Sequence, residues 1–231
     1  MHKKIYRLFT NPHTRYSMKR KILEILFRKK IVSSMRKRLD NQGFSIISSD
    51  CIGGLVYHDL QMQFKSPTVN MAIPAHSFVN LCSNLKYYMD IEPLKVKSEE
   101  TYPVMRIDDV ILNGIHYHSF EELRDKWNER KKRINYDNLF MIFTTKDGFD
   151  ETLLPLIDKI PGNKVLFSNK PYEYDWCCYL PEFANEDKVG DLTRYVGILG
   201  YKYYDNHFDV IKWLNGSSTI ECINGGQYNG K

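Results

Sequence analysis

Residues 44–60 read Phe-Ser-Ile-Ile-Ser-Ser-Asp-Cys-Ile-Gly-Gly-Leu-Val-Tyr-His-Asp-Leu, and the pattern changes part-way along this stretch. Residues 44–48 form a short apolar run, which is typical of a buried β-strand. Residues 55–60 have the apolar spacing of the first turns of a helix. The glycine pair between them favours a tight turn, because glycine has no Cβ. A strand, a turn and a helix in this order form the repeating unit of α/β folds.

Short apolar runs continue to alternate with helical patterns through the rest of the chain. Ser119 followed by Glu122 predicts a capped helix start. Apolar strands separated by helices are typical of a parallel sheet that is buried on both faces. We therefore predict an α/β fold in three layers, with a largely parallel or mixed sheet covered by helices. The expected strands are residues 44–48, 68–73, 104–107, 110–117, 138–144 and 164–168, and the expected helices begin near residues 55, 76, 119, 150 and 206 and end near residues 60, 89, 133, 160 and 214.

The positive charge of the chain is concentrated at its N-terminal side. Residues 1–40 carry 13 Lys and Arg against 2 acidic residues, a net charge of +11, whereas the remainder carries 20 against 26, a net charge of −6. Residues 16–39 lack Gly and Pro and predict a basic amphipathic helix. We expect residues 1–40 to form this arm and residues 41–231 to form a single α/β domain. The helix either packs on the domain with a solvated basic face or lies on an anionic membrane surface. Nucleic acid is a weaker partner, because no nucleic-acid-binding motif accompanies the charge.

Cysteine usage and hydropathy indicate the compartment. The five cysteines are scattered and show no CxxC spacing, which argues against a disulfide framework and a structural zinc site. No run approaches the roughly 18–20 apolar residues that span a bilayer, and no signal-peptide pattern follows the basic start. We expect a cytoplasmic protein, peripheral at the inner membrane face if the basic helix binds lipid.

The turn at residues 50–54 is the first candidate site. Ligands of open α/β sheets bind at the carboxyl ends of the strands. Asp50, Gly53 and Gly54 are therefore expected to bind a ligand, since N–H groups at a glycine pair and a helix N-terminus attract anions. Cys51 is a candidate nucleophile, with His58 as its base. The alternative is that Cys51 is a small buried residue and the glycines serve only the turn.

Two further positions extend this candidate site. Lys146 and Asp147 follow the expected strand 138–144 at the same sheet edge, so they are expected to bind ligand in the same crevice, unless they form an ordinary Lys-Asp-Gly turn. His116 and His118 are two residues apart at a strand end and face the same side. His116 is a candidate catalytic base, and the alternatives are a metal ligand, for which the spacing shows no third partner, and a structural histidine.

Other candidates have plainer alternatives. Asp108 and Asp109 are weak candidate ligands for a divalent metal on a sugar nucleotide, but adjacent strand residues point to opposite faces, so a solvated hairpin turn is the alternative. Residues 130–133 are all Arg or Lys and either complement a helix dipole or bind phosphate. The aromatic residues Tyr172, Tyr174, Trp176 and Tyr179 are either a sugar-stacking wall or part of the core.

Five segments carry a family resemblance. They are residues 44–54 (FSIISSDCIGG) with Tyr57 and His58, residues 66–70 (SPTVN), residues 102–117 from Tyr-Pro-Val to His-Tyr, residues 127–138 (WNERKKRIN with Asp137 and Asn138) and residues 163–165 (NKV). In order and spacing they resemble a bacterial family named domain of unknown function 1919, whose members occur among capsule and exopolysaccharide biosynthesis proteins. The resemblance covers roughly residues 42–170. It implies an intracellular role in building surface glycans and assigns no catalytic residue.

The residues and the resemblance together suggest three functions. The first is a glycosyl- or acyltransferase acting on a glycan precursor, with a nucleotide sugar or acetyl-coenzyme A as donor. The second is a non-catalytic assembly or regulatory protein of the same pathway, held at the membrane by residues 16–39. The third is a hydrolase that uses Cys51 or a serine near Ser48 and Ser49. Neither a DxD nor a GxGxxG motif is present to identify the donor.

Overall fold

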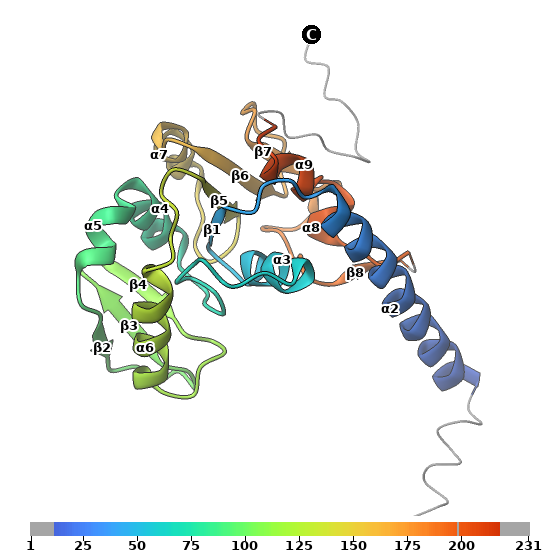
Figure 1. The fold of residues 1–231 in the computed structure, drawn as a ribbon, viewed down its shortest axis with the longest axis horizontal. Coiled ribbons are helices and arrows are strands. Elements are labelled where there is room, and N and C mark those ends of the chain that lie inside the picture. The colour runs from blue at the N-terminus through green and yellow to red at the C-terminus, as the bar shows by residue number, and fades with distance from the viewer. Residues whose placement is uncertain (1–11, 198, 218–231) are drawn as a thin grey trace, which may run out of the picture.

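The computed structural model describes residues 12–197 and 199–217, with side chains from residue 24 onward (Figure 1). Its main sheet has four parallel strands in the order β1-β5-β6-β7. They are β1 (Ser45–Ser48), β5 (Leu139–Thr144), β6 (Asn163–Ser168) and β7 (Cys177–Tyr179). The parallel sheet is confirmed, and β1, β5 and β6 each lie within one residue of their expected bounds. The edge strand β7 was not predicted.

Helices cover both faces of this sheet. Successive residues of a strand point to opposite sides, and since the strands are apolar at successive positions, both faces must be buried. Ile47 and Leu166 belong to one hydrophobic cluster, and Ile46 and Phe167 belong to the other. Each fully buried side chain of this size contributes about 1.5–3 kcal/mol, so both layers stabilise the sheet. The predicted three-layer α/β fold is confirmed. Helices α4 (Ala75–Ser83), α5 (Leu85–Asp90) and α7 (Leu154–Lys159) contribute to the first cluster, and helices α3 (Ile52–Leu60) and α9 (Val210–Leu214) contribute to the second.

A smaller antiparallel sheet lies beside the main one, with the order β2-β3-β4 (Figure 1). Its strands are β2 (Leu94–Val96), β3 (Val104–Ile107) and β4 (Val110–Asn113). The expected hairpin is confirmed, although β4 ends before residue 117. Helix α6 (Phe120–Lys131) follows, and Ser119 Oγ accepts the Glu122 N–H at 3.1 Å, as the capping pattern predicts. The Glu122 carboxylate accepts the N–H of His118 at 3.0 Å.

The expected strand at residues 68–73 is wrong. Side-chain hydroxyls compete with a ladder here, since Thr68 Oγ1 accepts the N–H of Ser48 at 3.1 Å and bonds Ser66 Oγ at 3.2 Å. Asn70 has a left-handed backbone with φ of 65°. Within the described residues, this segment pairs with a strand through one isolated antiparallel bridge, between Ala72 and Asn113.

Two expected helices are each broken in two. The helix at residues 76–89 divides into α4 and α5, because Asn84 leaves helical geometry with φ of −145°. The helix at residues 206–214 divides into α8 (Tyr203–Asn206) and α9, with Asp209 capping the latter through the Lys212 N–H at 3.1 Å. The helix expected at residues 150–160 is present as the 3₁₀ turn η1 (Glu151–Leu153) followed directly by α7. Short elements not predicted are β2, β8 (Tyr195–Val196), β9 (Tyr201–Lys202) and the 3₁₀ turn η2 (Pro181–Phe183).

The basic helix is confirmed as α2 (Pro12–Arg38), which extends away from the body at its N-terminal end (Figure 1). Its described inner face includes Arg28, Val32 and Met35, which are buried, whereas Ile25 and Leu26 are 50% and 52% exposed. The expected apolar side was therefore partly wrong, because charged and apolar residues share both faces. Within the described residues, every helix is too short or too polar to cross a membrane.

Arg28 connects α2 to the domain. Its guanidinium forms ion pairs with Asp59 of α3 and Asp205 of α8 and donates a hydrogen bond to the Tyr204 hydroxyl at 3.0 Å. The turn between β8 and β9 also packs on α2, since a Cβ at Gly200 would collide with the backbone of Arg28. The C-terminal half of α2 is therefore part of the folded body.

Candidate functional site

A cleft of about 710 Å³ opens where β1 and β5 reach their carboxyl ends. This position and size suit a small-molecule site, for which volumes of about 300–1,000 Å³ are usual. The cleft brings together most of the candidate residues from distant parts of the chain, and their roles remain predictions. Those that line it are Asp50, Cys51, Gly54, His58, His116, Lys146 and Asp147.

One face of α3 forms the floor of the cleft. Cys51, Gly54, Leu55 and His58 all line it, and their spacing of three, four and seven residues places them on one side of a helix. The nine residues of α3 rise about 13 Å. Asp50 and Phe64, which also line the cleft, precede and follow this helix in the chain.

A buried ion pair lies at the first end of the cleft. Lys146 Nζ is 3.5 Å from Asp50 Oδ2. Asp50 Oδ1 accepts the N–H of Ile52, the first residue of α3, at 3.0 Å. Burial raises the pKa of Asp50, and the Lys146 charge only partly offsets it. The helix N-terminus, where an anion was expected to bind, is therefore occupied by a carboxylate of the protein itself.

Cys51 is half-buried and poorly suited to act as a nucleophile. Burial, reinforced by the Asp50 charge, raises the pKa of its thiol to about 11, so the reactive thiolate is scarce near neutral pH. His58 is 79% exposed at its side chain, with Nδ1 3.7 Å from Asp59 Oδ1. No hydrogen bond joins Cys51 to His58 in the described structure.

The glycine pair has a packing role. A Cβ at Gly53 would lie 2.9 Å from Ser48 Cβ and 3.0 Å from Ile46 Cγ2, and one at Gly54 would lie 3.1 Å from Val69 Cγ1. Both glycines let α3 approach its neighbours closely. Gly54 also lines the cleft, whereas Gly53 faces β1.

The opposite wall comes from the segments around Asn70 and His116. The Val69 carbonyl accepts hydrogen bonds from the Tyr117 hydroxyl at 2.8 Å and from Arg130 Nη1 at 3.3 Å. These bonds hold Asn70 in its left-handed conformation beside the cleft, and such backbone conformations cluster at functional sites. His116 is exposed in the cleft.

Sequence reasoning missed half of the lining residues, among them Phe64, Asp191 and Thr193. Asp191 Oδ1 accepts hydrogen bonds from the N–H of Thr193 at 3.0 Å and from its hydroxyl at 2.6 Å. Partial burial raises the pKa of Asp191, but these bonds and the charges of Lys146 and Arg194 outweigh it, so the net shift is downward. The Asp-Leu-Thr pattern signals this turn, but nothing in the sequence indicates that it folds back over β5.

Comparison with known proteins now identifies the family. The model of the Domain of unknown function (DUF1919) matches residues 22–215. The chain belongs to this family. A relative described as an uncharacterized protein of Haemophilus influenzae (strain KW20 Rd) is 37% identical over 184 residues, which cover 79% of this chain and 89% of that protein. The family match extends beyond the segments that first suggested it, and it includes every residue of the DUF1919 cleft.

The remaining candidates lie outside the DUF1919 cleft lining. Asp108 and Asp109 form the turn between β3 and β4, where they accept hydrogen bonds from Tyr87, Tyr88 and Asn80 at 2.7–2.8 Å. His118 is exposed at the start of α6. No group of three candidate metal ligands occurs among the described residues.

The basic and aromatic groups also have structural partners. Arg130 is 8% exposed and Arg133 pairs with Glu129, so these two arginines pack within the fold. Trp176 stacks on Tyr174 with 4.5 Å between ring centroids and donates to Asp158 at 2.9 Å. This aromatic group packs on the first hydrophobic cluster, not in the cleft.

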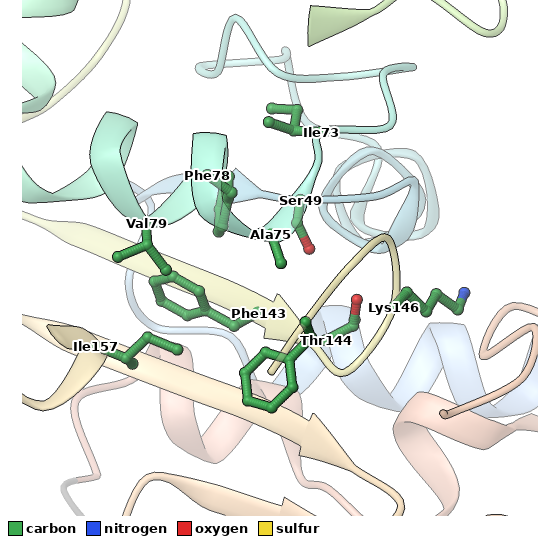
Figure 2. A pocket seen from close by; sticks show the side chains of 10 residues that line it. Ser49, Ile73, Ala75, Phe78, Val79, Phe143, Thr144, Lys146 and Ile157 are labelled. Carbon is green, nitrogen blue, oxygen red and sulfur yellow. The ribbon is translucent and has the colours of Figure 1, made fainter. Parts of the chain in front are cut away.

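A second pocket in this DUF1919 fold lies behind Lys146 and holds only about 10 Å³ (Figure 2). Figure 2 shows Phe78, Val79, Phe143 and Ile157 gathered on one side, with the Lys146 amino group directed away from them. Ser49 Oγ has no hydrogen-bond partner among the described residues. The space fits about one water-sized group, so Ser49 is closed to a substrate.

Proposed function

We propose that this DUF1919 protein is a transferase that moves a glycosyl or acyl group onto a hydroxyl of a surface-glycan precursor. The cleft is the observation that carries the proposal. It combines two exposed imidazoles, His58 and His116, with the exposed carboxylates of Asp147 and Asp191. The glycan as acceptor rests on the family resemblance.

Carboxylates in an open cleft suit a hydroxyl-rich ligand. Ionised carboxylates only accept hydrogen bonds, and sugar hydroxyls donate them. Asp147 and Asp191 line this end of the cleft beside the Asp50–Lys146 pair, so two carboxylates there can accept hydrogen bonds from hydroxyls. A sugar ring therefore suits this end.

A glycosyl group is transferred by direct displacement, and an acyl group by addition to its carbonyl carbon followed by elimination. An imidazole accepts the proton of the acceptor hydroxyl, the oxygen forms the new bond to the anomeric or acyl carbon, and the leaving group departs with the bonding electron pair. Either donor, a nucleotide sugar or acetyl-coenzyme A, fits this scheme. A covalent intermediate on Cys51 is not part of it, since the raised pKa of the thiol, about 11, opposes attack at neutral pH.

The test is thermal denaturation with nucleotide sugars, nucleoside diphosphates and acetyl-coenzyme A, followed by a transfer assay with the ligand that binds. A ligand at a hundred times its Kd stabilises by about 2.7 kcal/mol, which raises Tm by roughly 5–10 °C for a domain of this size. His116→Gln should reduce transfer at least tenfold, whereas His76→Gln, outside the cleft, should not. A donor shift without any transfer to sugar acceptors would contradict the proposal.

A second proposed property, attachment to an anionic membrane, is favoured by the surface of α2. Ile25, Leu26 and Leu199 are 50%, 52% and 57% exposed, and Leu199 precedes the Gly200 turn that packs on α2. Lys29 and Lys30 lie exposed on the same helix. Apolar side chains enter the interface while basic ones attract anionic lipid, each contributing about 1 kcal/mol. The membrane would place the enzyme beside lipid-linked acceptors.

A further inference from the structure

Phe64 lies at the far end of the cleft from Asp50. It follows the C-terminus of α3 by four residues, is half-buried, and supplies the one hydrocarbon ring among the described cleft-lining residues. Neither the transfer chemistry nor the sequence analysis used this residue. Its surroundings give it a role.

Two contacts hold the Phe64 ring, and a third holds its backbone. The guanidinium carbon of Arg130 is 5.1 Å from the ring centroid. Tyr57 packs on it nearly perpendicular, at 83°, with 5.9 Å between centroids. Arg133 Nη1 donates to the Phe64 carbonyl at 3.3 Å. The side chain and the backbone are both held.

Arg130 cannot easily move away from the ring. It is 8% exposed, and its Nη1 donates to the Tyr117 hydroxyl at 2.7 Å and to the Val69 carbonyl at 3.3 Å. Arg130 and the second hydrophobic cluster thus back the Phe64 ring, and the ring also lines the cleft. The ring is thus an apolar plane that is already oriented. Stacking a planar ligand on it therefore costs the protein little conformational entropy.

The two ends of the cleft differ in chemistry. Asp147 and Asp191 at one end suit sugar hydroxyls, whereas Phe64 at the other suits a flat ring. The residues that line the cleft along α3, Cys51 to His58, rise about 10 Å along its axis. This polarity matches a donor with a hydroxyl-rich or acyl group at one end and a heteroaromatic base at the other.

We infer that Phe64 is the stacking platform for the nucleobase of a nucleotide-containing donor. The inference rests on the proposed transferase function and narrows its donor, because it excludes donors without a base. Arg130 and Arg133 act as positioning residues for the ring. Base stacking on an aromatic side chain is worth about 1–3 kcal/mol, which corresponds to roughly a 5- to 150-fold change in Kd.

The experiment is isothermal titration of the full chain with uridine 5′-diphosphate, coenzyme A and ribose 5-phosphate, which lacks a base. Phe64→Leu should raise the Kd of the nucleotide that binds by about 5- to 150-fold and leave ribose 5-phosphate unchanged. Phe64→Tyr should stay within about threefold of the wild type, because it keeps the ring. Phe120→Leu is the matched control, since Phe120 is also half-buried with an arginine, Arg124, 5.8 Å from its centroid, but lies outside the cleft lining.

Two results would overturn the inference. One is nucleotide binding that Phe64→Leu and Phe120→Leu affect equally, with both variants folded by circular dichroism. The other is absence of binding by every nucleotide while a base-free donor supports transfer, which leaves the proposed function standing. Phe64-dependent nucleotide binding with no transfer to any acceptor would instead support the platform and contradict the transferase.

Discussion

Lys146 Nζ lies 3.5 Å from Asp50 Oδ2, and this pair joins the carboxyl ends of two neighbouring parallel strands, β5 and β1. Both side chains are largely buried, at 20% and 11% exposure. Burial raises the pKa of Asp50, and the lysine is the main group opposing that rise. The charge state at this end of the cleft therefore depends on a lysine from another strand.

Lys146→Met should destabilise the protein by about 1–3 kcal/mol at pH 8, because it leaves a buried carboxylate without its cation. The variant raises the pKa of Asp50 further above its unfolded value. A carboxylate whose pKa is higher in the folded state destabilises the fold at pH values above its pKa in the unfolded state. This penalty becomes smaller as the pH falls and the carboxylate is protonated in the folded protein. Urea unfolding should therefore show a smaller loss at pH 5 than at pH 8. Addition of Asp50→Asn should recover part of it, and an equal loss at both pH values would contradict the argument.

Gly53→Ala should cost about 1–3 kcal/mol, the usual range for overpacking. The new methyl on α3 would lie 2.9 Å from Ser48 Cβ and 3.0 Å from Ile46 Cγ2, against the buried strand β1. Gly43→Ala is the control, since the nearest atoms to its Cβ are side-chain nitrogens at 3.6 Å. The comparison is made by urea denaturation, and equal midpoints for the two variants would show that α3 can shift to accept the methyl.

Cys51 should react slowly with iodoacetamide in the folded protein. With its pKa raised to about 11, only about 0.1% is thiolate at pH 8. Mass spectrometry should show alkylation that is faster in urea and that keeps rising with pH beyond 9. Cys51→Ala should also retain transfer activity within about threefold. A rate that levels off near pH 7, with loss of turnover in Cys51→Ala, would restore the covalent mechanism.

Arg28→Met should destabilise the fold by about 3–5 kcal/mol, since it removes the cation that pairs with both Asp59 and Asp205. These buried carboxylates are then left with Lys202 as their cation. Arg38→Met is the matched control on the same helix. Arg38 pairs with Asp209 but is 50% exposed, so its loss should cost at most about 1 kcal/mol. Chemical denaturation gives both values, and similar costs would mean that the buried network adds nothing beyond a surface ion pair.

Ile25→Ser with Leu26→Ser should reduce binding to vesicles that contain phosphatidylserine, because the exposed apolar side chains of α2 no longer enter the interface. Cosedimentation with and without phosphatidylserine, and with added salt, measures it. Leu94→Ser with Leu156→Ser is the control, since these leucines are 54% and 46% exposed elsewhere on the surface. Loss of dimerisation with no change in lipid binding would assign the surface to a second copy instead.

Sequence reasoning succeeded where local pattern and packing agree. The runs that became β1, β5 and β6 are apolar on both faces, and Ser119 caps α6 as expected. It failed at residues 68–73, because the hydroxyls of Ser66 and Thr68 bond locally and to Ser48, which composition does not reveal. The edge-of-sheet rule located one end of the cleft, with Asp50, Cys51, Lys146 and Asp147. Phe64 and Asp191 were missed because only the tertiary fold brings them there.

The attachment of α2 has a consequence for the order of folding. Arg28 meets its partner Asp205 across a separation of 177 residues, and the Gly200 turn closes against the same stretch of helix. These contacts cannot form during synthesis until residue 205 has left the ribosome. For most of its translation, a newly made chain therefore carries a basic helix whose Arg28 has not yet met Asp205. Long-range closure of this kind is slow, so α2 is the part of the nascent protein that is longest available to a chaperone or to the membrane.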